Sequence, residues 1–502
     1  MYFFNAIDFI CVIFVYGFID TRNTVGQEEV SFGSVPEQSV SLRDPHPIGL
    51  SFEFYEFSAY VKSVPPTTQC IQNLEEALGS KIAFRIGGTT QDRASYDPQL
   101  DKAVKLQFSA NDKRVPEKLQ YGKEFIKLAS ALNGPTTIGL NRFSGDIENA
   151  FLASQEILKT MKNLESISLG NEPEFWKTRG PISRGKEWTP ETDSFSQAEW
   201  QHNLTQRLQF NDLFQLGEYL QLPKWGVENL IKINNPALDA TKSFAGHAFP
   251  QSACGKSRTD LKSLMSHKST VEFARKYRTE AAAAHKFGKN FYISETNSAT
   301  CGGGAISPMF GSGLWVLNFI MQSLLNGVSR IYFHHGTIGD SPYSFWGKRN
   351  IAAPYYGAYF AALALKEIDG VMMLDDGTTQ HAVYLLTGSS IPKRLLLYNS
   401  ELKSRQAGNM GSKANYKINL SGAAIFDHKA KVIRLSADQA TSRSDRKATP
   451  NINGLQFSED TCKKLEKSNN EGERGTTEIV GGVINIEVAA SQAVIIELNP
   501  KK

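Results

Sequence analysis

The sequence predicts an α/β fold, a (β/α)8 (TIM) barrel followed by a C-terminal antiparallel β-sandwich. Three observations support this prediction. Short apolar runs alternate with helical patterns between residues 49 and 336. After about residue 368 the pattern changes to short strands separated by turn-rich stretches. The chain of 502 residues is long enough for eight βα units and a second, smaller domain.

Seven runs rich in β-branched and aromatic residues have the composition of strands that are buried on both faces. They span residues 49–57, 81–88, 136–145, 166–175, 243–250, 289–298 and 329–336. We place the eighth strand near 225–233. Alternation with helices implies parallel strands joined by right-handed crossovers, and eight such units close a barrel. The alternative is an open, doubly wound sheet.

Helical patterns separate several of these runs and follow the last one. They span residues 116–133, 150–164, 269–287, 313–326 and 354–368. The pair Gly134-Pro135 is a stop signal for the first helix. A capping-box pattern, Ser269 followed three residues later by Glu272, marks the start of the third. The barrel is therefore expected over residues 49–368.

The C-terminal part, residues 369–502, reads as an antiparallel β-sandwich. Its strand-like runs are 381–386, 395–398, 416–420, 431–435, 480–488 and 493–498, with glycine- and asparagine-rich turns between them. Residues 27–48 form an N-terminal segment for which pairing with this β-domain is one option.

An apolar run over residues 9–19 is too short to span a bilayer and fits the core of a secretory signal peptide. We predict a signal peptide over residues 1–26 and a secreted protein, although Asp8 stands where such signals carry a basic residue. The alternative is a buried N-terminal strand or helix. No later stretch is apolar enough to span a membrane.

Cysteine and sequon positions fit export. Without residues 1–26, four cysteines remain at positions 70, 254, 301 and 462, and four cysteines allow three pairings. Sequons begin at Asn203 and Asn419, where N-glycans are possible in an exported chain. Lys and Arg total 55 against 51 for Asp and Glu, and this near balance gives no reason to expect a nucleic-acid partner.

Two predicted barrel strands end in a glutamate. The run Ser168-Leu169-Gly170 leads into Asn171 and Glu172, and Tyr292-Ile293-Ser294 leads into Glu295. Strand carboxyl ends form the active face of a (β/α)8 barrel, so these carboxyls are expected to face each other across its mouth. Two opposed carboxyl groups are what the cleavage of a glycosidic bond requires. A lone glutamate at a strand end is more often a helix cap or a surface ion pair, but two such motifs favour catalysis.

These motifs resemble the acid/base and nucleophile segments of clan A glycoside hydrolases. The segments Ser51-Phe52-Glu53-Phe54, residues 84–92 (Phe-Arg-Ile-Gly-Gly-Thr-Thr-Gln-Asp) and Phe333-His334-His335-Gly336 are similar to glycoside hydrolase family 79. That family contains β-glucuronidases and heparanases. The resemblance covers most of residues 45–500 and is closer to the microbial, mainly fungal, β-glucuronidases.

The resemblance implies a retaining double displacement without metal or other cofactor. Glu295 would be the nucleophile and Glu172 the acid/base. Asn171 would hold the sugar 2-hydroxyl, and Tyr292 would orient Glu295. Arg85 is expected to bind and position Glu295, since a charge within a barrel strand must be paired.

Further residues are candidates for holding a glucuronate. Glycines after the nucleophile strand would let backbone N–H groups approach a carboxylate, although this loop also reads as a flexible one joined through Cys301 to Cys254. Of the pair His334 and His335, we expect one to be structural. The substrate-binding candidates are Asn171, Tyr292, Glu53, Tyr55, Arg85, His247, Gly303, His335, Gly336 and Tyr343.

The leading functional hypothesis is a secreted, exo-acting β-glucuronidase that releases terminal β-linked glucuronate or 4-O-methylglucuronate from glycans. An endo-acting hydrolase of heparanase or hyaluronidase type is the second hypothesis. A non-catalytic glycan-binding barrel is the third, and the presence of both carboxyls argues against it.

Overall fold

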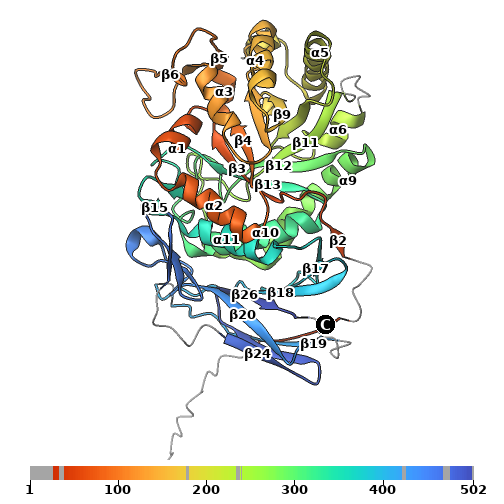
Figure 1. Ribbon diagram of the computed structural model, residues 1–502, viewed down its shortest axis with the longest axis vertical. Helices are drawn as coiled ribbons and strands as arrows, with labels where there is room; N and C mark the ends of the chain where they lie inside the picture. Colours follow the sequence, from red (N-terminus) through yellow and green to blue (C-terminus); the bar gives the residue numbers. More distant parts are fainter. Residues whose placement is uncertain are drawn as a thin grey trace, which may run out of the picture.

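The computed structural model describes residues 26–32, 39–176, 180–232, 238, 240–406, 408–420, 426–466 and 475–499. Within these residues eight parallel strands form a closed barrel, which confirms the predicted fold class (Figure 1). In barrel order the strands are β3 (Ile48–Glu53), β4 (Ala83–Gly87), β8 (Thr136–Leu140), β9 (Leu164–Leu169), β10 (Phe214–Tyr219), β11 (Thr241–Ala248), β12 (Asn290–Thr296) and β13 (Arg330–His335).

The fifth barrel strand lies earlier in the sequence than the segment near 225–233, where we expected the one strand without a clear apolar run. It is β10, whereas the segment near 225–233 holds helix α6 (Val227–Lys232), so that prediction was wrong. The sequence of β10, Phe-Gln-Leu-Gly-Glu-Tyr, has no β-branched residue and carries two polar side chains. These polar groups satisfy each other in the buried interior, where Gln215 Nε2 donates to Glu218 Oε1 at 2.5 Å. A strand that carries buried polar groups therefore lacks the usual strand composition.

Helices cover the outside of the barrel (Figure 1). They are α1 (Phe57–Ser63), α2 (Thr67–Leu78), α3 (Lys123–Ser130), α4 (Ile147–Thr160), α5 (Pro190–Leu208), α7 (Leu261–Met265), α8 (His267–Ala274), α9 (Arg278–Lys286), α10 (Phe310–Leu325) and α11 (Ala353–Leu365). The helix expected over 116–133 is shorter. Its first part is strand β7 (Lys118–Tyr121), which pairs with β5 (Ala94–Tyr96) and β6 (Val104–Gln107) in a small separate sheet.

The N-terminal cap of α8 also differs from the expected one. Ser266 is the N-cap, and its side chain accepts a hydrogen bond from the Ser269 amide. The helix therefore begins before the capping-box pattern that starts at Ser269. A short 3-10 turn, Arg275–Tyr277, separates it from α9.

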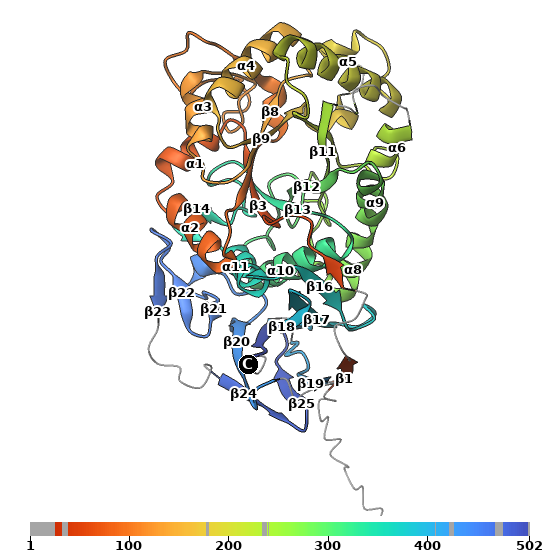
Figure 2. The same ribbon diagram turned by 45° about the vertical axis from the view of Figure 1, so that its right-hand side comes forward.

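The C-terminal β-domain lies against helices α10 and α11, on the side of these helices away from the barrel strands (Figure 2). Its main strands are β16 (Gly370–Met373), β17 (His381–Gly388), β18 (Ile391–Asn399), β19 (Ala414–Leu420), β20 (Lys429–Ser436), β24 (Gly475–Val480), β25 (Val483–Val488) and β26 (Gln492–Glu497). Successive side chains of a strand point to opposite faces. Accordingly, Val383 and Leu385 lie in the core of the β-domain, whereas Ala382, Tyr384 and Leu386 join the core of the barrel.

Two N-terminal strands also belong to the β-domain. Strand β1 (Gly26–Phe32) pairs in parallel with β19, and β2 (Val40–Ser41) pairs antiparallel with β16. Apart from Gly26, the proposed signal peptide over residues 1–26 lies outside the described residues. Among the helices of the described residues, none has the length and apolar character needed to cross a membrane.

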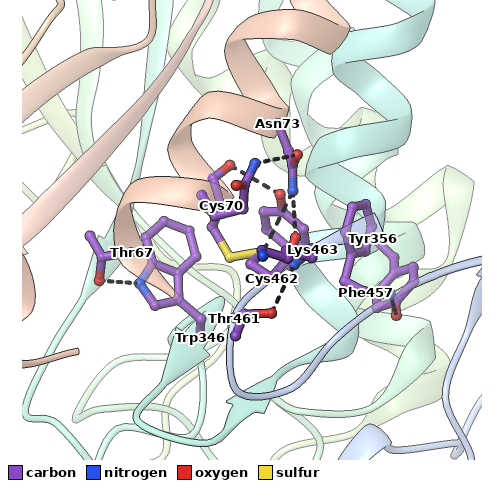
Figure 3. Close-up of a disulfide and its surroundings, with 11 residues drawn as sticks. Thr67, Cys70, Asn73, Trp346, Tyr356, Phe457, Thr461, Cys462 and Lys463 are labelled. Atoms are coloured by element: carbon purple, nitrogen blue, oxygen red, sulfur yellow. Dashed lines mark hydrogen bonds between the residues drawn. A yellow bond between two sulfur atoms is a disulfide. The ribbon is translucent and has the colours of Figure 1, made fainter. Parts of the chain in front are cut away.

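A disulfide joins the barrel to the β-domain (Figure 3). It links Cys70 in α2 to Cys462, and both residues are fully buried. Asn73 Nδ2, one helical turn after Cys70, donates to the Cys462 carbonyl at 2.7 Å. The second disulfide joins Cys254 and Cys301 and lies beside the carboxyl ends of the barrel strands.

We predict that replacing both Cys70 and Cys462 by Ala lowers the free energy of unfolding by about 2–4 kcal/mol, because the disulfide closes a very long loop in the unfolded chain. Urea denaturation measures the change. The matched control replaces Cys254 and Cys301, which are separated by 47 residues instead of 392, and should lose less. Equal losses for the two pairs would contradict the loop-length argument.

Candidate active site

Glu172 follows β9 in a main-chain conformation that aims its side chain into the barrel mouth. Gly170 has φ +89°, and a Cβ there would lie only 2.5 Å from the Trp176 ring, so glycine is required at this turn. Glu172 itself has φ +45°, a rare conformation for a residue other than glycine. Its amide donates to the Glu218 carbonyl at 3.2 Å, which ties this turn to β10.

Glu295, near the end of β12, lies opposite. Its carboxylate accepts a hydrogen bond from Arg85 at 2.7 Å, and the Arg85 side chain on β4 is fully buried. One carboxylate oxygen of Glu172, one of Glu295 and one ring nitrogen of His247 all lie within 4.8 Å of one another. The structure therefore brings the two predicted carboxyls to one end of the barrel.

His247 on β11 connects two carboxylates. Its Nδ1 lies 2.9 Å from Glu172 Oε1, and its Nε2 lies 3.2 Å from Glu218 Oε2. Glu218 also pairs with Arg85, in a buried ion pair. Arg85 thus contacts two carboxylates, and its second amine nitrogen donates to Asn171 Oδ1 at 2.9 Å.

A cavity of about 940 Å³ opens above these groups. Of the predicted residues, Glu53, Glu172, Glu295, Gly336 and Tyr343 line it.

Two predicted residues lie just behind the cavity wall. The Tyr55 hydroxyl donates to Thr337 Oγ1 at 2.8 Å, so Tyr55 supports the wall from behind. Gly303 is bonded back to the Thr300 carbonyl, and its neighbour Gly302 is the glycine that faces the cavity.

Two predicted placements were wrong. Tyr292 lies towards the amino-terminal ends of the strands, where its hydroxyl donates to Asp44 at 3.2 Å and Arg330 stacks on its ring, so it cannot orient Glu295. His335 points away from the cavity into a fully buried aromatic cluster, with the Trp346 ring 4.4 Å away. Alternation along β13 places His334 in the cavity wall instead, 3.7 Å from Glu295.

Known proteins resemble most of the chain. A family model described as "Glycosyl hydrolase family 79 C-terminal beta domain" matches residues 380–495. The solved structure of a 4-O-α-L-rhamnosyl-β-D-glucuronidase from Fusarium oxysporum 12S, in complex with Rha-GlcA, is 35% identical and superposes with a TM-score of 0.87. The superposition covers 94% of this chain and 100% of the Fusarium chain. The chain belongs to glycoside hydrolase family 79.

Curated relatives agree with this membership. A β-glucuronidase from Aspergillus niger is 28% identical over 402 residues, which is 71% of each chain. A β-glucuronidase from Neurospora crassa is 28% identical over 361 residues, 62% of this chain and 61% of its own. An α-L-arabinofuranosidase from Thermotoga maritima, at 12% identity and a TM-score of 0.60, shares the fold. The protein is a glycoside hydrolase.

The charged groups of the site determine which of its side chains carry a proton. Burial alone would raise the pKa of Glu295, but His334, His247 and Arg85 outweigh it and hold that pKa at about 2. Burial would lower the pKa of His247, but the charge of Glu295 and the hydrogen bonds to Glu172 and Glu218 raise it to about 10. Near neutral pH, Glu295 is therefore an anion and His247 a cation.

Glu218 is a residue of this site that was not among the predicted ones. Burial would raise its pKa, yet the charge of Arg85 and the hydrogen bond from His247 lower it to about 2. It is therefore a permanent anion between two cations. The signal in the sequence was a glutamate after Gly217 at the end of a short run, but no strand was assigned there.

The cluster of Glu172, His247 and Glu295 has the donor types of a metal site. The charges and hydrogen bonds around the cluster favour a hydrogen-bonded network without a metal ion. His247 uses both ring nitrogens on carboxylates, and its raised pKa means that it carries a proton instead of a free ligand pair. Arg85 supplies a second positive charge, to Glu218 and to Glu295. Each of the three side chains that a metal ion would bind therefore already has a partner within the site.

Two buried acids hold the Glu172 turn in place. Asp92 accepts hydrogen bonds from the Asn171 amide at 3.2 Å and from Trp176 Nε1 at 2.9 Å, and burial raises its pKa to about 8. Glu174 accepts from the amides of Leu220 and Gln221, which connects the loop after β9 to the loop after β10.

We predict that Glu218→Gln lowers the pKa of His247 from about 10 by roughly one pH unit or more, because one carboxylate partner loses its charge. NMR titration of the histidine side chains measures this pKa. A histidine with a raised pKa stabilises the fold fully below pH ~6.5, and this stabilisation is lost as the pH rises through about 10. The variant, with a lower pKa of His247, should therefore unfold at a lower pH than the wild type in alkaline solution. Glu228→Gln, which changes an exposed acid on α6, is the control. An unchanged titration would contradict the assigned charge on Glu218.

Proposed function

We propose that this glycoside hydrolase is a retaining, exo-acting β-glucuronidase that removes glucuronate from the non-reducing ends of glycans. The separation of its two carboxyl groups supports the retaining part of the proposal. One oxygen of Glu172 and one of Glu295 lie within 4.8 Å, which fits the roughly 5–5.5 Å of retaining enzymes and not the roughly 6.5–9.5 Å of inverting ones. The names of the Aspergillus, Neurospora and Fusarium relatives support glucuronate as the sugar.

In the first step, ionised Glu295 attacks the anomeric carbon while Glu172 donates a proton to the glycosidic oxygen. The bond from this carbon to the oxygen breaks, and the leaving group departs with the proton of Glu172. In the second step, Glu172 takes a proton from water, and the water oxygen displaces Glu295 from the anomeric carbon. The low pKa of Glu295 keeps the nucleophile ionised in the resting enzyme.

Asn171 is suited to the sugar 2-hydroxyl. Because Arg85 donates to its side-chain oxygen, the side-chain amide nitrogen is the group that remains available as a donor. A donor at the 2-hydroxyl is worth most in the transition state of glycoside cleavage. Tyr343 and Gly336 line the same cavity and are candidates for contacting the glucuronate carboxylate.

The cavity wall favours an exo-acting enzyme over one that cuts sulfated chains internally. Its described acidic residues are Glu53, Glu172, Glu295 and Asp340, and its basic side chains are Arg114, Lys276 and His334. An endo-acting enzyme for a polyanionic chain needs a groove that is mainly basic. Arg443 lines a different depression, beside Trp346 and Pro308, where it pairs with Asp445.

A 4-O-substituted glucuronate is a second candidate substrate. The cavity of about 940 Å³ lies near the upper end of the range of roughly 300–1,000 Å³ found for pockets that bury small ligands. It therefore has room for a substituent on the glucuronate, as in the Rha-GlcA that the Fusarium structure contains. The two candidates differ in product, free glucuronate or a disaccharide, which chromatography of glycan digests separates.

We also propose that the enzyme acts outside the cytosol. Two disulfides support this, since such bonds persist in oxidising compartments. Asn203 is half-buried on α5 and Asn419 is exposed on β19, so Asn419 is the more accessible position for an N-glycan. Mass spectrometry of the N-terminal peptide and of deglycosylated protein tests both points.

We predict that Glu295→Ala reduces turnover of 4-nitrophenyl β-glucuronide by about 10⁴-fold or more, because it removes the nucleophile. Glu172→Ala should keep more activity on this substrate, whose leaving group needs little protonation.

Azide separates the two roles. In Glu295→Ala it should yield the α-glucuronosyl azide by direct displacement, and in Glu172→Ala the β-azide by attack on the glycosyl-enzyme. Wild-type rates in both variants, or the opposite pattern of anomers, would contradict the assignments.

A further inference from the structure

The wall of the catalytic cavity has two chemically different sides. On one side, the loops after β9, β10 and β11 contribute four large apolar side chains, those of Phe175, Leu220, Leu222 and Phe249. On the other side, the loops after β12, β13, β3 and β4 contribute mostly polar ones, among them Thr300, Thr337, Ser341, Glu53 and Thr89. Each set comes from neighbouring barrel strands, so each forms a continuous arc.

The apolar arc is accessible. Phe175 is 48% exposed, although a phenylalanine normally gains from burial. Leu220, Leu222 and Phe249 are half-buried. Polar side chains, including those of Gln251 and Lys276, also line the cavity. An apolar surface that lies inside a catalytic cavity and is bordered by polar groups is typical of a ligand contact.

The arc is held in a fixed relation to Glu172. Phe175 is the last residue of the 3-10 turn Pro173–Phe175, and its amide donates to the Glu172 carbonyl at 3.0 Å. Glu174 binds the amides of Leu220 and Gln221, so the Phe175 turn and the Leu220 loop form one unit. The distance between these apolar side chains and the acid/base carboxyl of Glu172 is therefore fixed.

We propose that Phe175, Leu220, Leu222 and Phe249 form the leaving-group subsite, and that it takes an aglycone with a flat apolar face. This inference rests on the proposed function, because it uses Glu172 as the acid. The acid must reach the glycosidic oxygen, so the group bonded to that oxygen lies on the Glu172 side of the cavity. An aromatic ring or the C–H face of a hexopyranose offers the required surface.

The experiment compares leaving groups in one variant. Phe175→Ala is assayed with 4-nitrophenyl β-glucuronide, with a β-glucuronosyl galactoside and with β-glucuronyl fluoride, whose leaving group has no face to contact. We expect kcat/KM to fall at least tenfold for one or both of the first two substrates. The loss with the fluoride should be at least fivefold smaller, and Phe175→Tyr should restore activity.

Phe210→Ala is the matched control. Phe210 is 47% exposed and precedes β10, at the end of the barrel away from the cavity, so this variant should match the wild type on all three substrates. A loss with the aryl substrate alone supports an aromatic aglycone, and a loss with both ring-bearing substrates supports a pyranose face as well.

Two outcomes would overturn the subsite alone. One is an equal loss with the fluoride, which would mean that Phe175 only supports the Glu172 turn, and the other is no loss with any substrate. A wild-type enzyme that fails to hydrolyse glucuronyl fluoride would instead remove the proposed function, and this inference with it.

Discussion

A fully buried guanidinium organises this active site. The Arg85 side chain has no exposure to solvent, so its charge has to be neutralised inside the protein. Glu295 and Glu218 provide two carboxylates, and Asn171 and Ser51 accept further hydrogen bonds at 2.9 and 3.1 Å. Four barrel strands or their ends therefore converge on one side chain of β4. The positions of Glu295, Asn171 and Glu218 all depend on these contacts.

The main chain around the acid is strained in a way that fits such a site. Glu172 and Glu218 both have positive φ, 45° and 64°, in the left-handed region that glycine prefers. Such conformations persist only where the surrounding structure enforces them. Here Asp92, Glu174 and His247 enforce them by binding the amides and side chains of the two loops. The pocket is consequently organised before any substrate arrives.

Much of the barrel could be read from the sequence because strands buried on both faces have a strong apolar pattern. Strand β10 could not be predicted, because Gln215 and Glu218 break that pattern. Gln215 bonds to Glu218 and Glu218 pairs with Arg85, so their presence is explained only by the folded structure. Glu172 and Glu295 could be found because they end clear strands. His334 and His335 could not be separated, because a shift of one residue along a strand reverses the face of every side chain.

Tyr292 shows a further limit of spacing arguments. It lies three residues before Glu295 in the same strand, yet it serves an ion pair of Arg330 and Asp44 near the other end of the barrel. A strand rises about 3.3 Å per residue, so the three-residue step separates Tyr292 from Glu295 along β12. The residues of the neighbouring strands then determine which groups each side chain contacts.

The most direct measurement is the trapping of the covalent intermediate. In 2-deoxy-2-fluoro-β-glucuronyl fluoride the fluorine at C2 slows both steps, and the fluoride leaving group lets the glycosyl-enzyme accumulate. We expect a mass increase of one fluoroglucuronyl group on the intact protein, with the ester on Glu295 in the peptide map. A label on another residue, or an unlabelled enzyme that releases the α-anomer as first product, would contradict it.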